Sequence, residues 1–311
     1  MKKVAFIFPG QGSQSTGMGK DFFENSDIAK DMISKASQRL GFDFEELLFN
    51  ENDNLGQTQF TQPAILLVSC IALEIFKSKC DIKPQFVLGH SLGEFSALVA
   101  SGAIDYLDAV ELVHKRGLFM NEACAGAGAG MMALIGLTDE VVESMTKKQR
   151  EDGKQIWAAN YNMDGQIVVA GIRSDLEALV DTYKEAGAKR AIVLDMSVAS
   201  HCELLNSALD KLNPYLEKFI TNDFTTNIIS NVTADIYNTK DEAIDLLSKQ
   251  LISPVKYKHS IKAHANDLDM MIEFGNGAVL KGMNRKIIKS VSTLNVSDMK
   301  TLEDTLEKLN D

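Results

Sequence analysis

The chain has 311 residues, which is long enough for one large domain carrying a smaller one. Hydrophobic residues make up 45% and charged residues 24% of it, proportions that exclude a disordered, collagen-like or disulfide-dependent chain. It contains 32 Lys and Arg and 43 Asp and Glu, and the net charge of −11 argues against nucleic acid as a partner.

The first third of the chain predicts alternating strands and helices, as in an α/β protein. Val4 to Phe8 is an apolar run closed by Pro9 and Gly10, typical of a buried strand that ends in a glycine-rich loop. Thr61 is expected to cap a long apolar helix with Pro63 in its first turn. The expected elements are a strand over 4–8, a helix over 61–76, a strand over 86–88, a helix over 94–100 and a helix over 105–124.

A small-residue segment, 125–130, predicts a hinge between this region and a second pattern. The second pattern predicts a strand over 131–135, a helix over 138–148, strands over 156–159 and 167–170, a helix over 174–186 and a strand over 190–194. This β-α-β-β-α-β order is that of a ferredoxin-like unit. We therefore expect residues 127–198 to form an inserted ferredoxin-like subdomain.

The remaining chain is expected to return to the first domain. Helices are predicted from near His201 and Asp241, followed by a strand over 270–274 and a helix over 277–288. Residues 1–126 and 199–311 are accordingly assigned to one large α/β domain.

The cysteines and the apolar runs of the sequence indicate in which cellular compartment the protein is expected. The cysteines, at positions 70, 80, 124 and 202, have no C-x-x-C or matching histidine spacing, which predicts buried reduced thiols without a metal. The N-terminal apolar run is too short for a signal peptide. No stretch is expected to reach the roughly 20 apolar residues that cross a bilayer. We expect a cytoplasmic protein.

The motif Gly89-His90-Ser91-Leu92-Gly93 matches G-x-S-x-G and falls between a predicted strand and a predicted helix. A tight turn there exposes the serine hydroxyl, and the helix N-terminus stabilises negative charge developing on a carbonyl oxygen. This context favours Ser91 as a nucleophile. The alternative is a glycine-bracketed turn whose serine only caps the helix.

A serine nucleophile needs a base, and the chain has five histidines, at positions 90, 114, 201, 259 and 264. His90 lies within the turn and His114 on a core helix, so both are interpreted as structural. His201 follows Ser200, a good N-cap, and a helix N-terminus would keep its ring neutral. His201 is the preferred base, although the residues alone leave the other four open.

Arg116 lies in an apolar stripe of its predicted helix, with no carboxylate three or four residues away. A buried cation needs an anion from elsewhere, and the planar guanidinium suits a carboxylate held by two bonds. A tertiary ion pair or a surface arginine would leave the same pattern.

The loop Gly10-Gln11-Gly12-Ser13-Gln14 matches neither phosphate-binding template, because Ser15 and Met18 stand where glycine and lysine are required. We expect the backbone N–H of Gln11 to supply an oxyanion donor, since such donors come from another strand-end loop in serine enzymes of this kind. A simple glycine turn is the alternative.

These features together resemble the malonyl-CoA:acyl carrier protein transacylase family. The similarity follows, in order, the 10–14 loop, Gly89 to Glu94, Arg116-Gly117 with Met120, Ser200-His201, Gln250 and Pro254-Val255. The resemblance implies an α/β-hydrolase-like domain with a ferredoxin-like insertion. It also implies Ser91 as nucleophile, His201 as base, the N–H groups of Gln11 and Leu92 as oxyanion hole, Arg116 as carboxylate ligand and the Gln250 carbonyl as the group that orients His201.

The activity that the resemblance implies is ping-pong transfer of malonyl from coenzyme A to acyl carrier protein in fatty acid synthesis, by a monomer without metal or redox cofactor. Acyl carrier proteins are acidic, so a basic patch is expected to dock them. The candidates are Lys281, Arg285, Lys286 and Lys289, and the pair Lys189-Arg190.

Three other functions remain open from the sequence. A patatin-like serine hydrolase would pair Ser91 with Asp164 of an Asp-Gly motif, although Asp-Gly here also suits a hairpin turn. A stand-alone acyltransferase of a polyketide synthase would share every motif. A non-catalytic docking module would form no acyl adduct.

Overall fold

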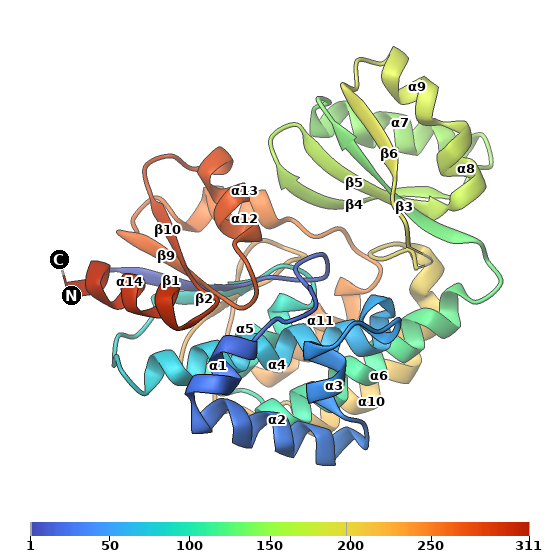
Figure 1. Ribbon diagram of the computed structural model, residues 1–311. Coiled ribbons are helices and arrows are strands. Elements are labelled where there is room, and N and C mark those ends of the chain that lie inside the picture. The colour runs from blue at the N-terminus through green and yellow to red at the C-terminus, as the bar shows by residue number, and fades with distance from the viewer. Residues whose placement is uncertain (1, 197, 311) are drawn as a thin grey trace.

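The computed structural model describes residues 2–196 and 198–310, which form two sheets with helices packed around them (Figure 1). The larger unit comprises β1 (Val4–Phe8), α1 (Lys20–Asn25), α2 (Asp27–Leu40), α3 (Phe44–Phe49), η1 (Asn54–Gly56), α4 (Thr58–Lys77), β2 (Phe86–Gly89), α5 (Gly93–Ser101), α6 (Tyr106–Cys124), η2 (Glu203–Leu205), α10 (Asn206–Phe219), β7 (Ile228–Ile229), β8 (Ile236–Tyr237), α11 (Lys240–Gln250), α12 (Tyr257–His264), β9 (Met270–Phe274), α13 (Val279–Ile287), β10 (Ser292–Val296) and α14 (Met299–Asn310). The smaller unit, residues 129–193, comprises β3 (Ala129–Ile135), α7 (Asp139–Glu151), β4 (Ile156–Met163), β5 (Gln166–Ile172), α8 (Arg173–Ala178), α9 (Val180–Glu185) and β6 (Arg190–Val193).

The larger sheet has the strand order β10-β9-β1-β2-β7-β8. Its first five strands are parallel, and only β8 pairs antiparallel. The smaller sheet has the order β4-β5-β3-β6 and is antiparallel throughout. The chain is therefore a mixed α/β protein. In the parallel sheet the carboxyl ends of β1, β2, β7 and β9 share one edge, where loops can gather functional side chains.

Strand β1 lies at the centre of the larger sheet and is buried along its whole length, as its uniformly apolar sequence predicts. On one face, the rings of Phe6, Phe76 and Phe274 contact one another edge to face. Helix α4 lies on this face and packs along α6.

Helix α4 corrects the expectation about apolar runs. By length and composition it could cross a membrane, the one such helix among the described residues. Its apolar window is 83% buried in the structure, and a core helix passes the same test.

The start of α4 was also wrong in the sequence prediction. The helix begins at Thr58, so Thr61 is not its cap and Pro63 lies in its interior. A proline there cannot donate to the carbonyl four residues earlier, which belongs to Gln59. Nδ1 of His114 lies 2.7 Å from that oxygen and satisfies it. A tertiary contact thus replaces the missing helical bond.

Other differences concern boundaries and short elements. The helix predicted over 174–186 is broken at Leu179 into α8 and α9. The helix predicted from His201 begins at Asn206, after the short turn η2. The predicted strands 4–8 and 270–274 match β1 and β9. Cys70, Cys124 and Cys202 are buried free thiols, whereas Cys80 is partly exposed.

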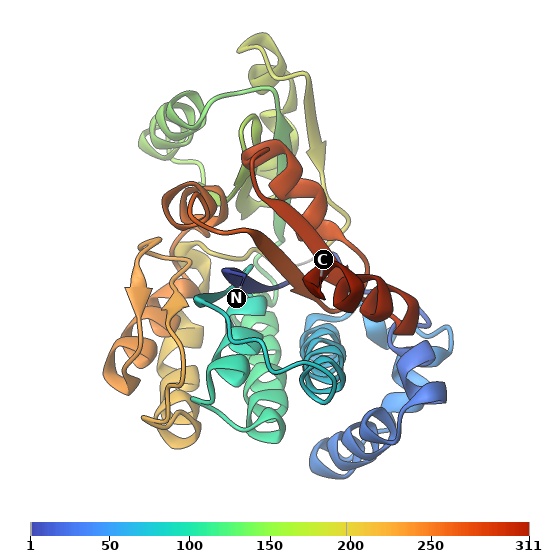
Figure 2. The same ribbon diagram turned by 90° about the vertical axis from the view of Figure 1, so that its left-hand side faces the viewer.

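The smaller unit stands beside the loops of the larger sheet, as the two views in Figures 1 and 2 show. Backbone hydrogen bonds join it to the segment before α12: Tyr161 N–H donates to Val255 O, and Val255 N–H donates to Ala159 O. This pairing extends the edge strand β4 into the larger unit.

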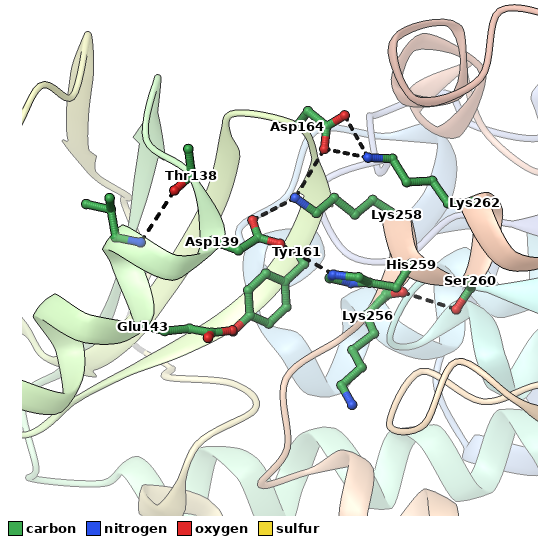
Figure 3. Close-up of polar contacts among 11 residues, drawn as sticks. Thr138, Asp139, Glu143, Tyr161, Asp164, Lys256, Lys258, His259, Ser260 and Lys262 are labelled. Atoms are coloured by element: carbon green, nitrogen blue, oxygen red, sulfur yellow. Dashed lines mark hydrogen bonds and ion pairs between the residues drawn. The ribbon is translucent and has the colours of Figure 1, made fainter.

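An ionic cluster reinforces this junction (Figure 3). We call it the Lys258 cluster, and it consists of Asp139 and Asp164 from the smaller unit and Lys258, His259 and Lys262 from α12. Lys258 Nζ lies 2.6 Å from Asp139 and 3.3 Å from Asp164, and Lys262 Nζ lies 2.8 Å from Asp164. The cluster therefore fixes the smaller unit relative to α12.

Candidate active site

Ser91 occupies a sharp turn between β2 and α5, with a positive φ of 52°. A Cβ added to Gly89 would lie 1.8 Å from the carbonyl carbon of Gly93, and one added to Gly93 would lie 2.1 Å from Phe8 O. No side chain fits at either position, so the two glycines of the motif are required sterically. The turn brings the serine hydroxyl to the carboxyl edge of the larger sheet.

Asn231, two residues after β7, holds this turn in place. The backbone N–H of Ser91 donates to Asn231 Oδ1 at 2.6 Å, and Asn231 Nδ2 donates to Gly89 O at 2.7 Å. These two bonds span the strained residue and offset the unfavourable φ. Nothing in the local sequence singles out Asn231, because it lies 140 positions from Ser91 along the chain.

His201 is the histidine that meets Ser91. Its Nε2 lies 2.8 Å from Ser91 Oγ, and its Nδ1 lies 2.7 Å from the backbone oxygen of Gln250. A carbonyl oxygen only accepts, so Nδ1 carries the proton and Nε2 is free to accept one. His201 also has a positive φ, 60°, and is 2% exposed.

The neutral state of His201 has a different cause from the one predicted. No helix begins at this residue, since α10 starts five positions later. Burial is the main reason that the pKa of His201 falls to about 3, and the positive charge of Arg116 lowers it further. The ring is therefore neutral at physiological pH.

The other four histidines have partners elsewhere. His90 Nε2 contacts Asn162 Oδ1, His114 contacts Gln59 O, His259 contacts Asp139, and His264 Nε2 donates to Ala234 O. The interpretation of His90 and His114 as structural agrees with these contacts.

Arg116 is 1% exposed and extends from α6 to the serine. Its Nη1 donates to Gln62 Oε1 at 2.7 Å, its Nη2 donates to Gln250 Oε1 at 3.1 Å, and Nη2 lies 3.4 Å from Ser91 Oγ. The guanidinium also lies over the ring of Phe95. Burial lowers the pKa of Arg116 to about 10, so the group stays charged. Among the described residues, Nε has no hydrogen-bond partner.

Gln62 is a functional neighbour that the sequence did not indicate. It lies within the apolar α4, where a buried glutamine is unusual, and its Nε2 donates to Thr58 Oγ1 at 2.7 Å. Since Nε2 is engaged there, its oxygen faces Arg116. The sequence carried no clear signal, because Thr58, Gln59 and Thr61 in the same part of α4 are polar too.

Gln11 follows β1 and lies beside the serine turn. A Cβ on the preceding Gly10 would be 2.3 Å from His90 O, so the two loops are in close contact. The Gln11 side chain accepts a hydrogen bond from Thr58 Oγ1 at 2.8 Å. Within residues 2–196 and 198–310, the backbone N–H groups of Gln11 and Leu92 donate to no other residue. Both N–H groups are therefore unpaired in the described structure, and Gln11 lines both cavities beside the serine.

A cavity of about 160 Å³ lies at Ser91, enclosed by both units. It is lined by Gly10, Gln11, His90, Ser91, Met131, Asn160, Asn162, Val168, Leu194, Met196, Ser200, His201, Val279, Leu280 and Met283. A second cavity of about 770 Å³ shares Gln11 and Met196 with it and reaches Arg173 and Asn121. The first suits a small acyl group and the second a longer chain leading to it.

Asp164 does not join this arrangement. It belongs to the turn between β4 and β5, where it binds Lys258 and Lys262. Ser91 Oγ meets His201 instead, and the Gln250 carbonyl orients this histidine where a Ser-His-Asp triad would use a carboxylate. The Ser–Asp pairing considered from the sequence is therefore wrong.

Comparison with known proteins agrees with this geometry. The model of the acyl transferase domain family matches residues 5–303. A malonyl CoA-acyl carrier protein transacylase of Bacillus subtilis is 42% identical, covering 100% of this chain and 99% of the relative. The chain belongs to the malonyl-CoA:acyl carrier protein transacylase family.

Solved structures of transacylases have the same fold. A Helicobacter pylori transacylase aligns with a TM-score of 0.96 and 42% identity over 100% of this chain and 99% of that one. A malonyl-transacylase in complex with a type II polyketide synthase acyl carrier protein aligns with a TM-score of 0.94 and 34% identity, over 98% and 99% of the two chains. The resemblance predicted from the motifs is confirmed at the level of the transacylase family.

Proposed function

We propose that this chain moves malonyl from coenzyme A to the phosphopantetheine thiol of acyl carrier protein, through a serine ester, in fatty acid synthesis. The observation that carries the proposal is the contact of Ser91 with neutral His201 and with buried Arg116, beside a small cavity that Ser91 and His201 line. The names of the full-length relatives support it.

In the acylation step, His201 Nε2 takes the proton of the Ser91 hydroxyl as Oγ attacks the thioester carbonyl. The N–H groups of Gln11 and Leu92 stabilise the negative oxygen of the tetrahedral intermediate. The bond from carbon to sulfur then breaks, and the imidazolium gives its proton to the departing coenzyme A thiolate. The Gln250 carbonyl holds Nδ1–H throughout and favours the charged ring.

The second half of the reaction reverses these roles. The thiol of the carrier protein enters the same cavity, His201 takes its proton, and the sulfur attacks the serine ester. Collapse of the intermediate releases malonyl-carrier protein and returns the proton to Ser91 Oγ. Water must be kept from the ester, and the partly buried position of Ser91 in a small cavity between the two units serves this end.

Arg116 is proposed to bind the free carboxylate of the malonyl group. The cation is already desolvated and is held by the oxygens of Gln62 and Gln250, with Nε still without a partner among the described residues. A carboxylate that reaches it gains charge-assisted bonds without further desolvation of the cation. Acetyl has no such group, so Arg116 is the proposed source of selectivity.

Helix α13 is proposed as the docking surface for the acidic carrier protein. Its Val279, Leu280 and Met283 line the cavity, while Lys281, Arg285 and Lys286 are exposed on the same helix, followed by exposed Lys289. The pair Lys189-Arg190 is less favoured, since it lies at the end of β6 away from the cavity-lining Leu194. A carrier on α13 would have a short path for its thiol.

We also propose the finer description of the architecture made from the sequence. Residues 1–126 and 199–311 would form an α/β-hydrolase-like domain, supported by the parallel sheet and the serine turn. Residues 127–198 would form a ferredoxin-like insertion, supported by the element order of the smaller unit.

Intact mass after brief mixing with malonyl-CoA tests the function. The wild type is expected to gain one malonyl group, and Ser91→Ala none, because the variant has no hydroxyl to acylate. Adding acyl carrier protein should discharge the adduct onto its thiol. Absence of a Ser91-dependent adduct, or release of free malonate without transfer, would contradict the proposal.

A further inference from the structure

Glu94 lies directly beneath the serine turn, in the first turn of α5, and is 1% exposed. Its Oε2 accepts from Gln250 Nε2 at 2.7 Å and from the backbone N–H of Asn231 at 3.2 Å. Its Oε1 accepts from the Tyr237 hydroxyl at 3.1 Å. The mechanism above makes no use of this carboxylate.

Gln250 connects Glu94 to the reacting groups in two ways. Its backbone oxygen holds His201, and its side-chain oxygen accepts from Arg116 Nη2 at 3.1 Å. Its side-chain Nε2 donates to Glu94 and to Ser91 O, at 2.7 and 3.1 Å. One buried residue therefore contacts the base, the cation and the nucleophile's backbone.

Glu94, Arg116 and the Ser91 carbonyl together leave the Gln250 amide only one satisfactory orientation. Glu94 in its ionised form can only accept, so the NH₂ end of the amide must face it and the oxygen must face Arg116. If the amide turned over, its NH₂ would meet the donors of Arg116, and its oxygen would meet the carboxylate. Two unfavourable contacts in a buried site would result.

Glu94 also compensates the charge of Arg116. Among the described residues no carboxylate touches the guanidinium directly, and Glu94 approaches it through the Gln250 amide. The negative charge of Glu94 favours the cationic form of Arg116. The cation is thus balanced while its donors stay open to a ligand.

We propose that Glu94 is a positioning residue: its carboxylate orients the side-chain amide of Gln250, which in turn aims Arg116 at the carboxylate of the incoming acyl group. This inference rests on the proposed function, since it assigns to Glu94 a part of the selectivity for malonyl. It predicts that loss of the carboxylate weakens malonyl transfer more than acetyl transfer.

The same logic gives a pH dependence. A protonated Glu94 can donate as well as accept, so it no longer favours one orientation of the Gln250 amide and no longer balances the charge of Arg116. The orientation is then left to Arg116 and the Ser91 carbonyl alone. Burial raises the pKa of Glu94 to about 7. The charged or titratable groups around it are Arg116 from α6 and Tyr237 from β8, and Gln250 links it to His201. His201 serves both acyl donors, so its titration cancels in their ratio.

The test compares the acylation rates of Ser91 with malonyl-CoA and acetyl-CoA, measured by quenched mass spectrometry at pH 8.5. Glu94→Gln keeps the size of the side chain but removes its negative charge. The new amide can donate as well as accept hydrogen bonds. The substitution is expected to lower the malonyl:acetyl ratio about tenfold, as for loss of one hydrogen bond to a charged group. Tyr237→Phe removes a bond from the opposite oxygen of Glu94 and should change the ratio less than threefold.

A pH series on the wild type needs no variant and guards against misfolding. The ratio should rise with pH through about 7 in the wild type and stay flat in Glu94→Gln. If Glu94→Gln only reduced the fraction of correctly folded enzyme, both acylation rates would fall equally. The malonyl:acetyl ratio would then stay unchanged. An unchanged ratio in Glu94→Gln, or a wild-type ratio independent of pH, would overturn the inference. A wild type that does not prefer malonyl would instead contradict the proposed function.

Discussion

Two polar networks in this molecule treat a buried cation in opposite ways. In the Lys258 cluster, the lysine side chain is 7% exposed and contacts the carboxylates of Asp139 and Asp164 directly. Beneath the serine, Arg116 is 1% exposed and contacts the neutral oxygens of Gln62 and Gln250. Lys258 is paired directly with carboxylates, whereas Arg116 contacts only neutral oxygens and keeps Nε without a partner among the described residues.

The difference follows from what each network does. A cluster that joins two units is best served by saturated ion pairs, because each unpaired buried charge would weaken the junction. A binding site needs a cation whose anion is missing until the substrate arrives. Glu94 does not touch Arg116 and acts on it through the Gln250 amide. Its negative charge stabilises the buried cation without occupying the place of a substrate carboxylate.

The largest expected effect is on the malonyl:acetyl ratio, when Arg116 is removed. Arg116→Ala should weaken malonyl transfer relative to acetyl transfer by about 2 to 5 kcal/mol, or roughly 30-fold to several-thousand-fold, since the acyl carboxylate loses its partner. Rates with the two coenzyme A donors measure this. Equal losses for both donors would refute the role given to Arg116.

Removing Lys258 should affect the stability of the protein and leave its selectivity between acyl donors unchanged. Lys258→Met leaves Asp139 without its closest partner and should lower the free energy of unfolding by about 1 to 3 kcal/mol. Denaturant unfolding measures this, and the malonyl:acetyl ratio should be unaffected. Lys262→Met is the matched control: its side chain is 47% exposed, so the loss should stay within about 0.5 kcal/mol. Similar losses in the two variants would remove the distinction between them.

The smallest effect is expected at a cation that is neither buried nor paired with a carboxylate. Lys286→Glu on α13 should raise the KM for acyl carrier protein several-fold, because a repulsive charge meets the acidic partner. The KM for malonyl-CoA should not change, since the side chain is exposed and lines neither cavity at the active site. Steady-state kinetics with each substrate varied in turn separate the two constants. A carrier constant equal to that of the wild type would argue against docking at this helix.

Several features could be predicted because their causes are local. The serine turn follows from steric exclusion at Gly89 and Gly93, which any chain with that spacing meets between a strand and a helix. Strand β1 follows from five apolar residues ended by a proline and a glycine. Arg116 stood out because an apolar helical stripe makes a lone cation conspicuous.

Other features failed or were missed because their causes lie far away in sequence. Helix α4 continues through Pro63, since His114, on another helix, satisfies the carbonyl that the proline leaves open. His201 is neutral because burial and Arg116 disfavour its charge, and not because a helix starts there. Asn231, Gln62 and Glu94 are ordinary polar residues until folding surrounds them with partners.

The amino-acid sequence by itself therefore determined the order of the elements, the serine turn and the family, since these depend on short-range periodicity and on motifs of a few residues. Only the tertiary structure brought His201 into contact with Ser91 across 110 positions, and joined Glu94 to Gln250 across 156 positions. The physical reason is that such hydrogen bonds depend on burial and direction, which exist only once distant segments have packed together.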